Sequence, residues 1–173
     1  MAGYIGNYPT AVPLTSADLN DGIITSAKIA DGTISSADLA SGVGGKILQV
    51  VTATDSTQRS SSSTTFVTGS NTLTITITPS SATNKIFLIG TISVNAPSAD
   101  VHLTIFRDAT NIGNATGGLA KDRAENGSAI SILDSPNTTS SITYQVYFRN
   151  STANTGYINT SLSSSITAFE IAG

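Results

Sequence analysis

The sequence predicts an all-β protein: a C-terminal jelly-roll-like β-sandwich preceded by an extended N-terminal arm that contains three ten-residue repeats. The composition is the first reason, with 25 Ser, 26 Thr and 15 Gly among 173 residues, because Thr favours strands whereas Ser and Gly favour turns. The other two reasons are three similar decapeptides in residues 14–44 and a series of short strand-like segments from residue 45 onward. A chain of this length suits one domain with an arm.

Low charge is the second feature of the composition. Charged residues make up only 11% of the chain, and the formal net charge is −3. The surface of a lone monomer normally carries more charge, so we expect oligomerisation or packing into a larger assembly; a monomer kept soluble by its hydroxyl groups is the alternative. The eight Lys and Arg residues are scattered, which argues against nucleic acid as a partner. Since no apolar run approaches the ~20 residues of a membrane span, we expect no membrane insertion.

Residues 1–13, MAGYIGNYPTAVP, form a tail that is too short to fold by itself. Aromatic side chains in such a tail commonly anchor it in a groove of a partner. We therefore expect the tail to dock on another protein through Tyr4, Ile5, Tyr8 and Pro9. A frayed terminus is the alternative.

Residues 14–44 form an arm of three decapeptides, LTSADLNDGI, ITSAKIADGT and ISSADLASGV. Ser and Thr near the start of each unit are good helix N-caps, and the Ala and the Asp or Lys that follow continue a first turn. The Gly that closes each unit suits the left-handed conformation that ends a helix. Each unit is therefore predicted to be one helical turn, a Gly stop and an extended step.

Two apolar side chains recur in every decapeptide, and they are the predicted contact between chains. Two per unit cannot form a core within one chain, so repeats of this kind bury them against copies of themselves. Around a threefold axis they would meet their symmetry mates, which predicts a homotrimer. A repetitive disordered linker is the alternative, although linkers are usually poor in Leu and Ile. The predicted trimer interface consists of Leu14, Leu19, Ile24, Ile29, Ile34 and Leu39.

Gly44-Gly45 marks the start of the C-terminal domain, residues 45–173, in which apolar runs alternate with turn residues. The runs 71–79, 99–108 and 140–150 alternate strictly and should bury one face, whereas 84–95 is continuously apolar and is expected to be buried on both faces. The run at 59–63 is expected to be a flexible loop. So many short strands indicate a β-sandwich, jelly-roll-like in arrangement. The predicted strands are 46–53, 64–68, 71–79, 84–95, 99–108, 129–134, 140–150, 155–162 and 164–172.

Few residues in this chain are suited to catalytic chemistry. It contains one His, no Cys and eleven carboxylates spread along the sequence, whereas an enzyme gathers titratable groups at a cleft. His102 alternates with Val101 and Leu103, so we expect it to face solvent or a subunit seam. We predict that the protein is not an enzyme and uses neither a cofactor nor a metal. A polysaccharide depolymerase is a remote alternative, which would need two carboxylates ~5–10 Å apart.

The polar, Gly-rich segment 110–128 is the candidate binding loop of the C-terminal domain. Long loops at the rim of a rigid sandwich are where recognition usually occurs. Arg107, Arg123, Tyr147 and Tyr157 are expected to contribute to a rim that faces a protein or a sugar. A host surface glycan would then be the partner of a receptor-binding adhesin. A plain variable loop is the alternative.

From about residue 45 to residue 172 the sequence resembles the C-terminal domains of fibre-like virion proteins of tailed bacteriophages. The segments that carry the resemblance are GKILQV, ITPSSATNKI, LDSP and SSIT…EIA. TSAKIADGTISSADLASG resembles the shaft or neck segments that precede such domains, and YIGN-x-P resembles their virion-proximal starts.

The resemblance implies a homotrimeric structural protein of the virion. Residues 1–13 would be a virion-anchoring tail that docks on other virion proteins, residues 14–44 a shaft, and residues 45–173 an outward-facing knob. A shaft of three decapeptides is short for a host-seeking long tail fibre. A short tail fibre and a capsid-decorating head fibre both fit this length.

Overall fold

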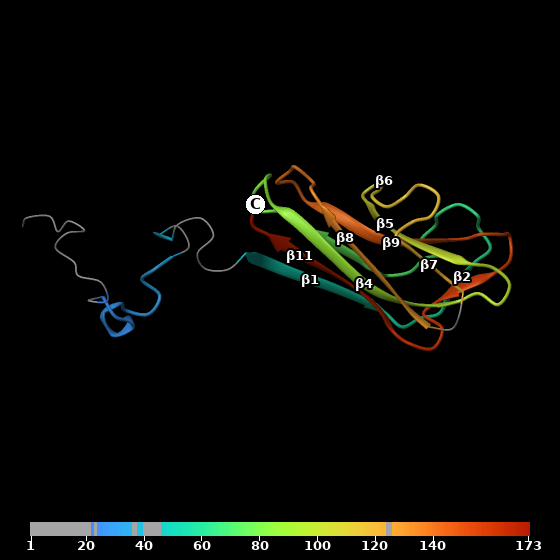
Figure 1. The fold of residues 1–173 in the computed structure, drawn as a ribbon, viewed down its shortest axis with the longest axis horizontal. Helices are drawn as coiled ribbons and strands as arrows, with labels where there is room; N and C mark the ends of the chain where they lie inside the picture. Colours follow the sequence, from blue (N-terminus) through green and yellow to red (C-terminus); the bar gives the residue numbers. More distant parts are fainter. Residues whose placement is uncertain (1–21, 23, 36–37, 40–45, 124–125) are drawn as a thin grey trace, which may run out of the picture. The chain divides into compact units, whose positions relative to one another are not determined.

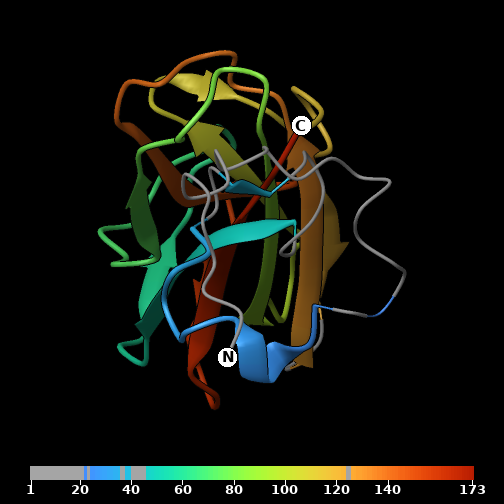
Figure 2. The same ribbon diagram turned by 90° about the vertical axis from the view of Figure 1, so that its left-hand side faces the viewer.

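The computed structural model describes residues 22, 24–35, 38–39, 46–123 and 126–173. The chain divides into two units, residues 1–44 and 45–173, and each is described by itself (Figure 1). In the first unit, the described residues contain one short 3₁₀ helix, η2 (Ser26–Lys28). In the second unit, they form two antiparallel sheets (Figure 2).

Sheet A has the strand order β1-β11-β4-β10-β2, with β8 paired to β4. Sheet B has the order β3-β9-β5-β6, with β7 paired to β5. Every one of these pairs is antiparallel. The strands of sheet A are β1 (Ile47–Asp55), β2 (Arg59–Ser61), β4 (Lys85–Asn95), β8 (Asn126–Asp134), β10 (Gly156–Ile158) and β11 (Ser164–Ile171). Those of sheet B are β3 (Thr74–Ile77), β5 (Val101–Arg107), β6 (Thr110–Asn111), β7 (Ala120–Asp122) and β9 (Ile142–Asn150).

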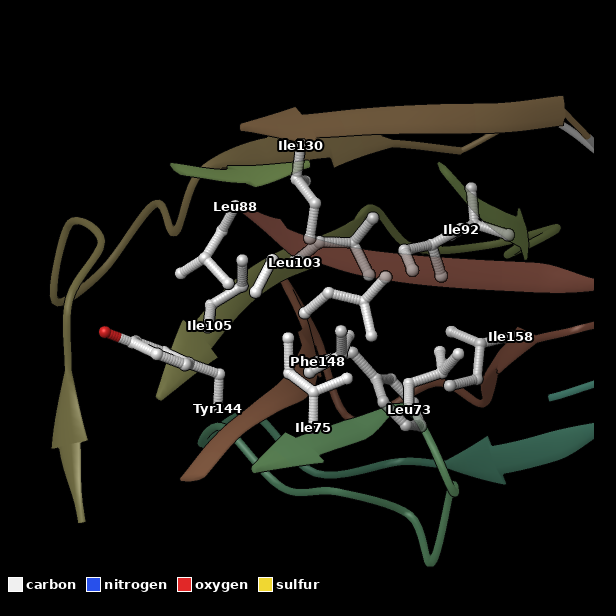
Figure 3. Close-up of a cluster of buried hydrophobic side chains, with 14 of the residues drawn as sticks. Leu73, Ile75, Leu88, Ile92, Leu103, Ile105, Ile130, Tyr144, Phe148 and Ile158 are labelled. Carbon is white, nitrogen blue, oxygen red and sulfur yellow. The ribbon is translucent and has the colours of Figure 1, made fainter. Parts of the chain in front are cut away.

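One cluster of buried apolar side chains fills the space between the inner faces of the two sheets (Figure 3). Because each sheet buries one face against the other, the unit is an all-β, β-sandwich-like fold, as the sequence predicts. Sheet A contributes Leu88, Ile92, Ile130, Ile158 and Ile166, and sheet B contributes Ile75, Leu103, Ile105, Tyr144 and Phe148, each at most 3% exposed.

The strictly alternating runs bury the face that their pattern predicts. A period of two is what a half-buried strand requires, because successive side chains point to opposite faces. The inward positions are all buried, which confirms this part of the prediction. They are Leu73, Ile75 and Ile77 in and beside β3, Val101, Leu103 and Ile105 in β5, and Ile142, Tyr144, Val146 and Phe148 in β9.

β4 departs from the prediction over most of its length, because only its inner face is buried from Lys85 to Thr91, whereas Ile92, Ser93 and Val94 are buried in succession. Ile86, Leu88 and Ile92 face the core and are fully buried, whereas Ile89 is 43% exposed and Phe87 is partly exposed. The expectation that 84–95 is buried on both faces is therefore wrong for the first seven residues of β4 and is confirmed only at Ile92, Ser93 and Val94. The run is continuously apolar because the outer face of this strand is apolar as well as its inner face.

Three segments differ from the predicted strand assignment. The run 59–63 carries β2, which pairs with β10 and is held by Asn150 Nδ2 donating to Ser61 O at 2.7 Å. The segment 110–128 contains β6, β7 and the start of β8. Conversely, 64–68 is not a strand, and only Val67 bridges to Phe148.

A buried carboxylate, Glu170 on β11, ties three segments together at one end of sheet A. Its Oε1 accepts hydrogen bonds from Ser80 N at 2.6 Å, Ser80 Oγ at 2.8 Å and Asn84 Nδ2 at 2.6 Å, and its Oε2 accepts one from Gln49 Nε2 at 2.5 Å. Burial alone would raise the pKa of this carboxyl, but the hydrogen bonds from Asn84, Gln49 and Ser80 outweigh it and lower the pKa. An ionised Glu170 thus links β1 and the β3–β4 connection to β11.

Candidate functional site

The same turn occurs in the second and third decapeptides of the arm. Lys28 N donates to Thr25 O at 2.9 Å, and ten residues later Asp38 N donates to Ser35 O at 3.0 Å. In the third unit, Ser35 Oγ and Ser35 N also donate to Asp38 Oδ2, at 2.7 and 2.9 Å, in the manner of a capping box. These two hydrogen bonds from Ser35 lower the pKa of Asp38. In the second unit, Thr25 forms no side-chain cap.

Two glycines of the repeat have a left-handed backbone conformation, but in the second decapeptide η2 ends at Ile29 in extended conformation. Gly32 lies in the next turn, which Thr33 N closes by donating to Ala30 O at 3.1 Å. Gly22 has φ 76° and Gly32 has φ 78°, both in the left-handed region that favours glycine. The corresponding Gly42 lies outside the described residues. The predicted left-handed conformation is confirmed at Gly22 and Gly32, whereas the prediction that this Gly ends the helical turn is wrong for Gly32.

The apolar side chains of the described part of the arm are largely exposed in the single chain. Ile24, Ile29 and Ile34 are 55%, 36% and 50% exposed, and Leu39 is partly buried. These isoleucines therefore offer apolar surface to a partner. That the partner is a second and third copy of the chain stays a prediction.

Six residues of the predicted anchor and trimer interface lie outside the described part of the chain. Leu14 and Leu19 of the predicted trimer interface lie outside the described residues. So do the four residues of the predicted anchor, Tyr4, Ile5, Tyr8 and Pro9.

Arg107, one of the four predicted rim residues, ends β5 and forms an ion pair between the two sheets. Its Nη1 donates to both carboxylate oxygens of Asp134 on β8, at 2.9 and 2.8 Å, and Tyr144 Oη donates to Asp134 Oδ2 at 2.6 Å. Burial, followed by the hydrogen bond to Asp134, raises the pKa of Tyr144. The guanidinium of Arg107 thus connects sheet B to sheet A.

Arg123 and Tyr157 lie toward the other end of the sandwich. Arg123 Nε donates at 3.0 Å to Asp100, which directly precedes β5, and Tyr157 pairs with Asn95 at the end of β4. Arg107 ends β5, and seven residues of strand span about 23 Å. The structure therefore does not bring Arg107 together with Arg123 and Tyr157, and a recognition role for each of them stays a prediction.

Tyr147, the fourth predicted rim residue, belongs to a group of three rings and one guanidinium on the outer face of sheet B. We call it the aromatic cluster, and its members are Phe66, Phe106, Tyr147 and Arg149. Tyr147 stacks on Phe106 with ring centroids 4.0 Å apart, and Phe106 meets Phe66 edge to face at 6.4 Å. The Arg149 guanidinium lies 5.5 Å from the ring centroid of Phe66, a cation–π distance. All four side chains are partly exposed. The cluster presents aromatic surface beside a fixed positive charge.

The segment that follows β6 folds back onto this face. Arg149 Nε donates to Thr116 O at 2.8 Å, and the partly exposed His102 has its Nδ1 3.2 Å from Gly117 O. Gly118 has φ 71°, and a Cβ there would collide with the backbone of β5. The described part of 110–128 is thus a turn packed on the sheet, held by backbone carbonyls that face Arg149 and His102.

Asp55 holds a loop by hydrogen bonds and an ion pair. Asp55 accepts hydrogen bonds from Thr72 N and Thr57 N, both at 2.9 Å, and pairs with Arg59 at 3.4 Å. Burial opposes ionisation of Asp55, but these three partners lower its pKa. In the described part of the chain, no group of three His, Asp or Glu side chains is placed to hold a metal ion.

Phe66, Phe106 and Arg149 were not among the residues that sequence reasoning selected. The sequence could have indicated two of them, because successive side chains of a strand point to opposite faces. Phe106 therefore lies on the face away from the buried Ile105, and Arg149 lies on the same face as Tyr147. Phe66 lies in a segment that is not a strand, so no periodic pattern marks its direction.

No family model matches this chain, and no curated protein does. A search for membrane-spanning helices is likewise negative over the residues that the structure describes.

Proposed function

We propose that the protein is a bacteriophage virion structural protein, a short homotrimeric fibre. Residues 1–13 anchor it to other virion proteins, residues 14–44 form the intertwined shaft, and residues 45–173 form a jelly-roll-like knob. Both a tail fibre and a capsid-decorating head fibre are consistent with this proposal. The resemblance of the sequence to fibre-like virion proteins supports the location in a virion.

The observation that carries the proposal is the exposure of Ile24, Ile29 and Ile34 in a turn that repeats every ten residues. Full burial of such a side chain contributes about 1.5–3 kcal/mol, so burying the exposed half contributes about 1 kcal/mol. Three isoleucines in each of three chains then supply about 9 kcal/mol. A trimer forms through two associations, and each costs about 4–15 kcal/mol. The three isoleucines therefore supply only part of the free energy that a trimer needs, and the other arm residues and the knob must supply the rest.

Measuring the mass of the full chain in solution tests the trimer. We expect light scattering to give three times the chain mass of 17.6 kDa. Replacing Ile24, Ile29 and Ile34 with Asp should reduce this to the mass of one chain. A matched control replaces the neighbouring exposed Thr25, Ala30 and Thr33 with Asp and should remain trimeric. If the wild-type chain has the mass of a monomer, the proposal is wrong.

Incorporation into particles tests the anchor separately. A chain that lacks residues 1–45 should fold as a knob and fail to join virions, because the proposed anchor and shaft are gone. Normal incorporation of that chain would contradict the assignment of residues 1–13 as the anchor.

A second candidate function is a carbohydrate-binding adhesin, which the aromatic cluster favours. Binding sites combine aromatic surface with a few fixed polar groups, and the cluster offers Tyr147, Phe106 and Arg149 on one face. A glycan array probed with the full chain should then report binding that Tyr147→Ala abolishes and Leu162→Ala leaves unchanged. Absence of binding to any host polysaccharide would count against this candidate.

A further inference from the structure

A row of large apolar side chains crosses the outer face of sheet A. The register pairs Val50 with Phe169, Phe169 with Phe87, and Phe87 with Leu133, so these residues of β1, β11, β4 and β8 stand side by side. The rings of Phe87 and Phe169 have centroids 6.2 Å apart. In Figure 1 the first three of these strands lie next to one another, as the register requires.

This face holds most of the exposed apolar surface of the second unit. Nine large apolar side chains are exposed among the described residues: three belong to the arm, one is Leu162, and five belong to this face. We call the surface around them the sheet A face, and its members are Ile47, Leu48, Val50, Phe87, Ile89, Leu133 and Phe169. Five of these members are largely exposed: Ile47 by 60%, Leu48 by 48%, Val50 by 53%, Ile89 by 43% and Leu133 by 54%.

The surroundings of the sheet A face are polar but almost without charge. The next row across the four strands is Thr52, Thr167, Ile89 and Ser131, and Thr52 and Thr167 share a hydrogen bond at 2.9 Å. Lys85 lies at one end of the face and donates to Ser135 Oγ. A face of this kind suits a partner that is itself apolar, rich in hydroxyl groups and uncharged, and a second copy of the same face meets that description.

The size of the face indicates how it can be used. The members of the face lie in the rows from Lys85 to Ile89 of β4. Four strands at about 4.8 Å spacing and five residues at about 3.3 Å rise cover roughly 320 Å². That is within the range of the largest apolar patch on a monomer, roughly 300–600 Å², and well below the ~800 Å² that each partner buries in a standard stable interface. The face alone is therefore too small to hold a dimer, and it needs a second contact that keeps the copies together.

The arm supplies that second contact, because the face begins where the arm ends. Ile47 follows Leu39 by eight residues, so the chain can separate them by at most about 28 Å. If three arms are wound together, three copies of the sheet A face are held within this reach. Short tethers of this kind give effective concentrations in the millimolar range, at which a weak contact forms.

We propose that the sheet A face packs against the same face of neighbouring copies inside the trimer, and so forms the contact between knobs. This inference rests on the proposed function, since the arms bring the copies together. The knobs then associate through Val50, Phe87, Ile89, Leu133 and Phe169, and the hydroxyl rows flank the apolar contact.

Cysteine labelling tests the proposal, because the natural chain contains no Cys and an engineered thiol is therefore unique. Ile89→Cys reports on the face, and Leu162→Cys, 62% exposed and away from the face, is the matched control. A maleimide should react with the reduced full-length Ile89→Cys chain about tenfold more slowly than with Leu162→Cys, as expected if the face is uncovered for a tenth of the time. Light scattering on the same samples gives the oligomeric state.

Cross-linking identifies what covers the face. A short bismaleimide should link copies of at least one of the variants Val50→Cys, Ile89→Cys and Leu133→Cys, and should not link Leu162→Cys. If the trimer forms but Ile89→Cys reacts as fast as Leu162→Cys, the face is free and this inference fails while the proposed trimer stands. If the thiol is protected but no face variant links, something other than a second copy covers the face, which also overturns the inference. If the chain has the mass of a monomer, the proposed trimer fails and this inference fails with it.

Discussion

Replacing Glu170 with Gln should destabilise the β-sandwich-like unit at neutral pH and much less at low pH. Hydrogen bonds to a charged group contribute about 1.5–3 kcal/mol, whereas neutral ones contribute about 0.5–1.5 kcal/mol. In Glu170→Gln, the three hydrogen bonds from Ser80 and Asn84 lose their charged acceptor. The new amide nitrogen is itself a donor, so it cannot accept the hydrogen bond from Gln49 Nε2. We estimate a loss of about 3 kcal/mol in the free energy of unfolding.

The pH dependence follows from the lowered pKa of Glu170. A carboxyl whose pKa is lower in the folded state than its ordinary 4.5 stabilises the fold above that value, and this contribution is lost as the pH falls through the folded-state pKa. On acidification the wild type therefore loses the contribution of ionised Glu170 to its free energy of unfolding. Glu170→Gln lacks this contribution at every pH. The gap between the two proteins should narrow as the pH falls below 4.5.

Urea unfolding at pH 7 and pH 3, with thermal melts alongside, measures both effects. For a unit of roughly 130 residues, a loss of about 3 kcal/mol lowers Tm by about 11 °C. Asp38→Asn is the control, because it removes the same charge from the arm and should leave the unfolding of residues 45–173 unchanged. A loss below about 0.5 kcal/mol at pH 7, or an equal loss at both pH values, would refute the role assigned to ionised Glu170.

Three further substitutions probe the packing and the turns. Phe148→Ala empties a fully buried site and should cost about 3–5 kcal/mol in denaturant unfolding, so a cost under about 1 kcal/mol would contradict the burial. Gly118→Ala adds a Cβ at φ 71° against Leu103 O and should cost about 2 kcal/mol or more, and an unchanged Tm would show that the turn conformation is wrong. Arg107→Met leaves Asp134 without its cation and should cost about 1–2 kcal/mol; adding Asp134→Asn should recover part of that loss, and a double-mutant cycle without coupling would exclude the ion pair.

Strand faces could be predicted from the sequence wherever one face is apolar and the other is not. β3, β5 and β9 alternate with a period of two, and their buried residues follow directly from that pattern. β4 misled the prediction because its outer face also carries apolar residues, Phe87 and Ile89, and periodicity alone cannot tell a covered face from an exposed one.

Two of the features that sequence reasoning missed depend on partners far away in the chain. β2 is a run of Arg and Ser with no strand pattern of its own, and it exists because β10 and Asn150 hold it. The aromatic cluster likewise joins Phe66 to Phe106 and Arg149 from β5 and β9. Of the predicted rim residues, Tyr147 meets this cluster, whereas Arg107 and Arg123 are separated because β5 runs the length of the sheet between them.

The place of β11 in sheet A has a consequence for how the protein is made. β11 lies between β1 and β4, and the cross-strand partners Thr52 and Thr167 are 115 residues apart in the chain. A domain folds as a unit during synthesis, and pairings this distant form slowly. During synthesis, β1 therefore keeps an unpaired edge until β11 has been translated, whereas the arm precedes β1 in the chain and leaves the ribosome before it.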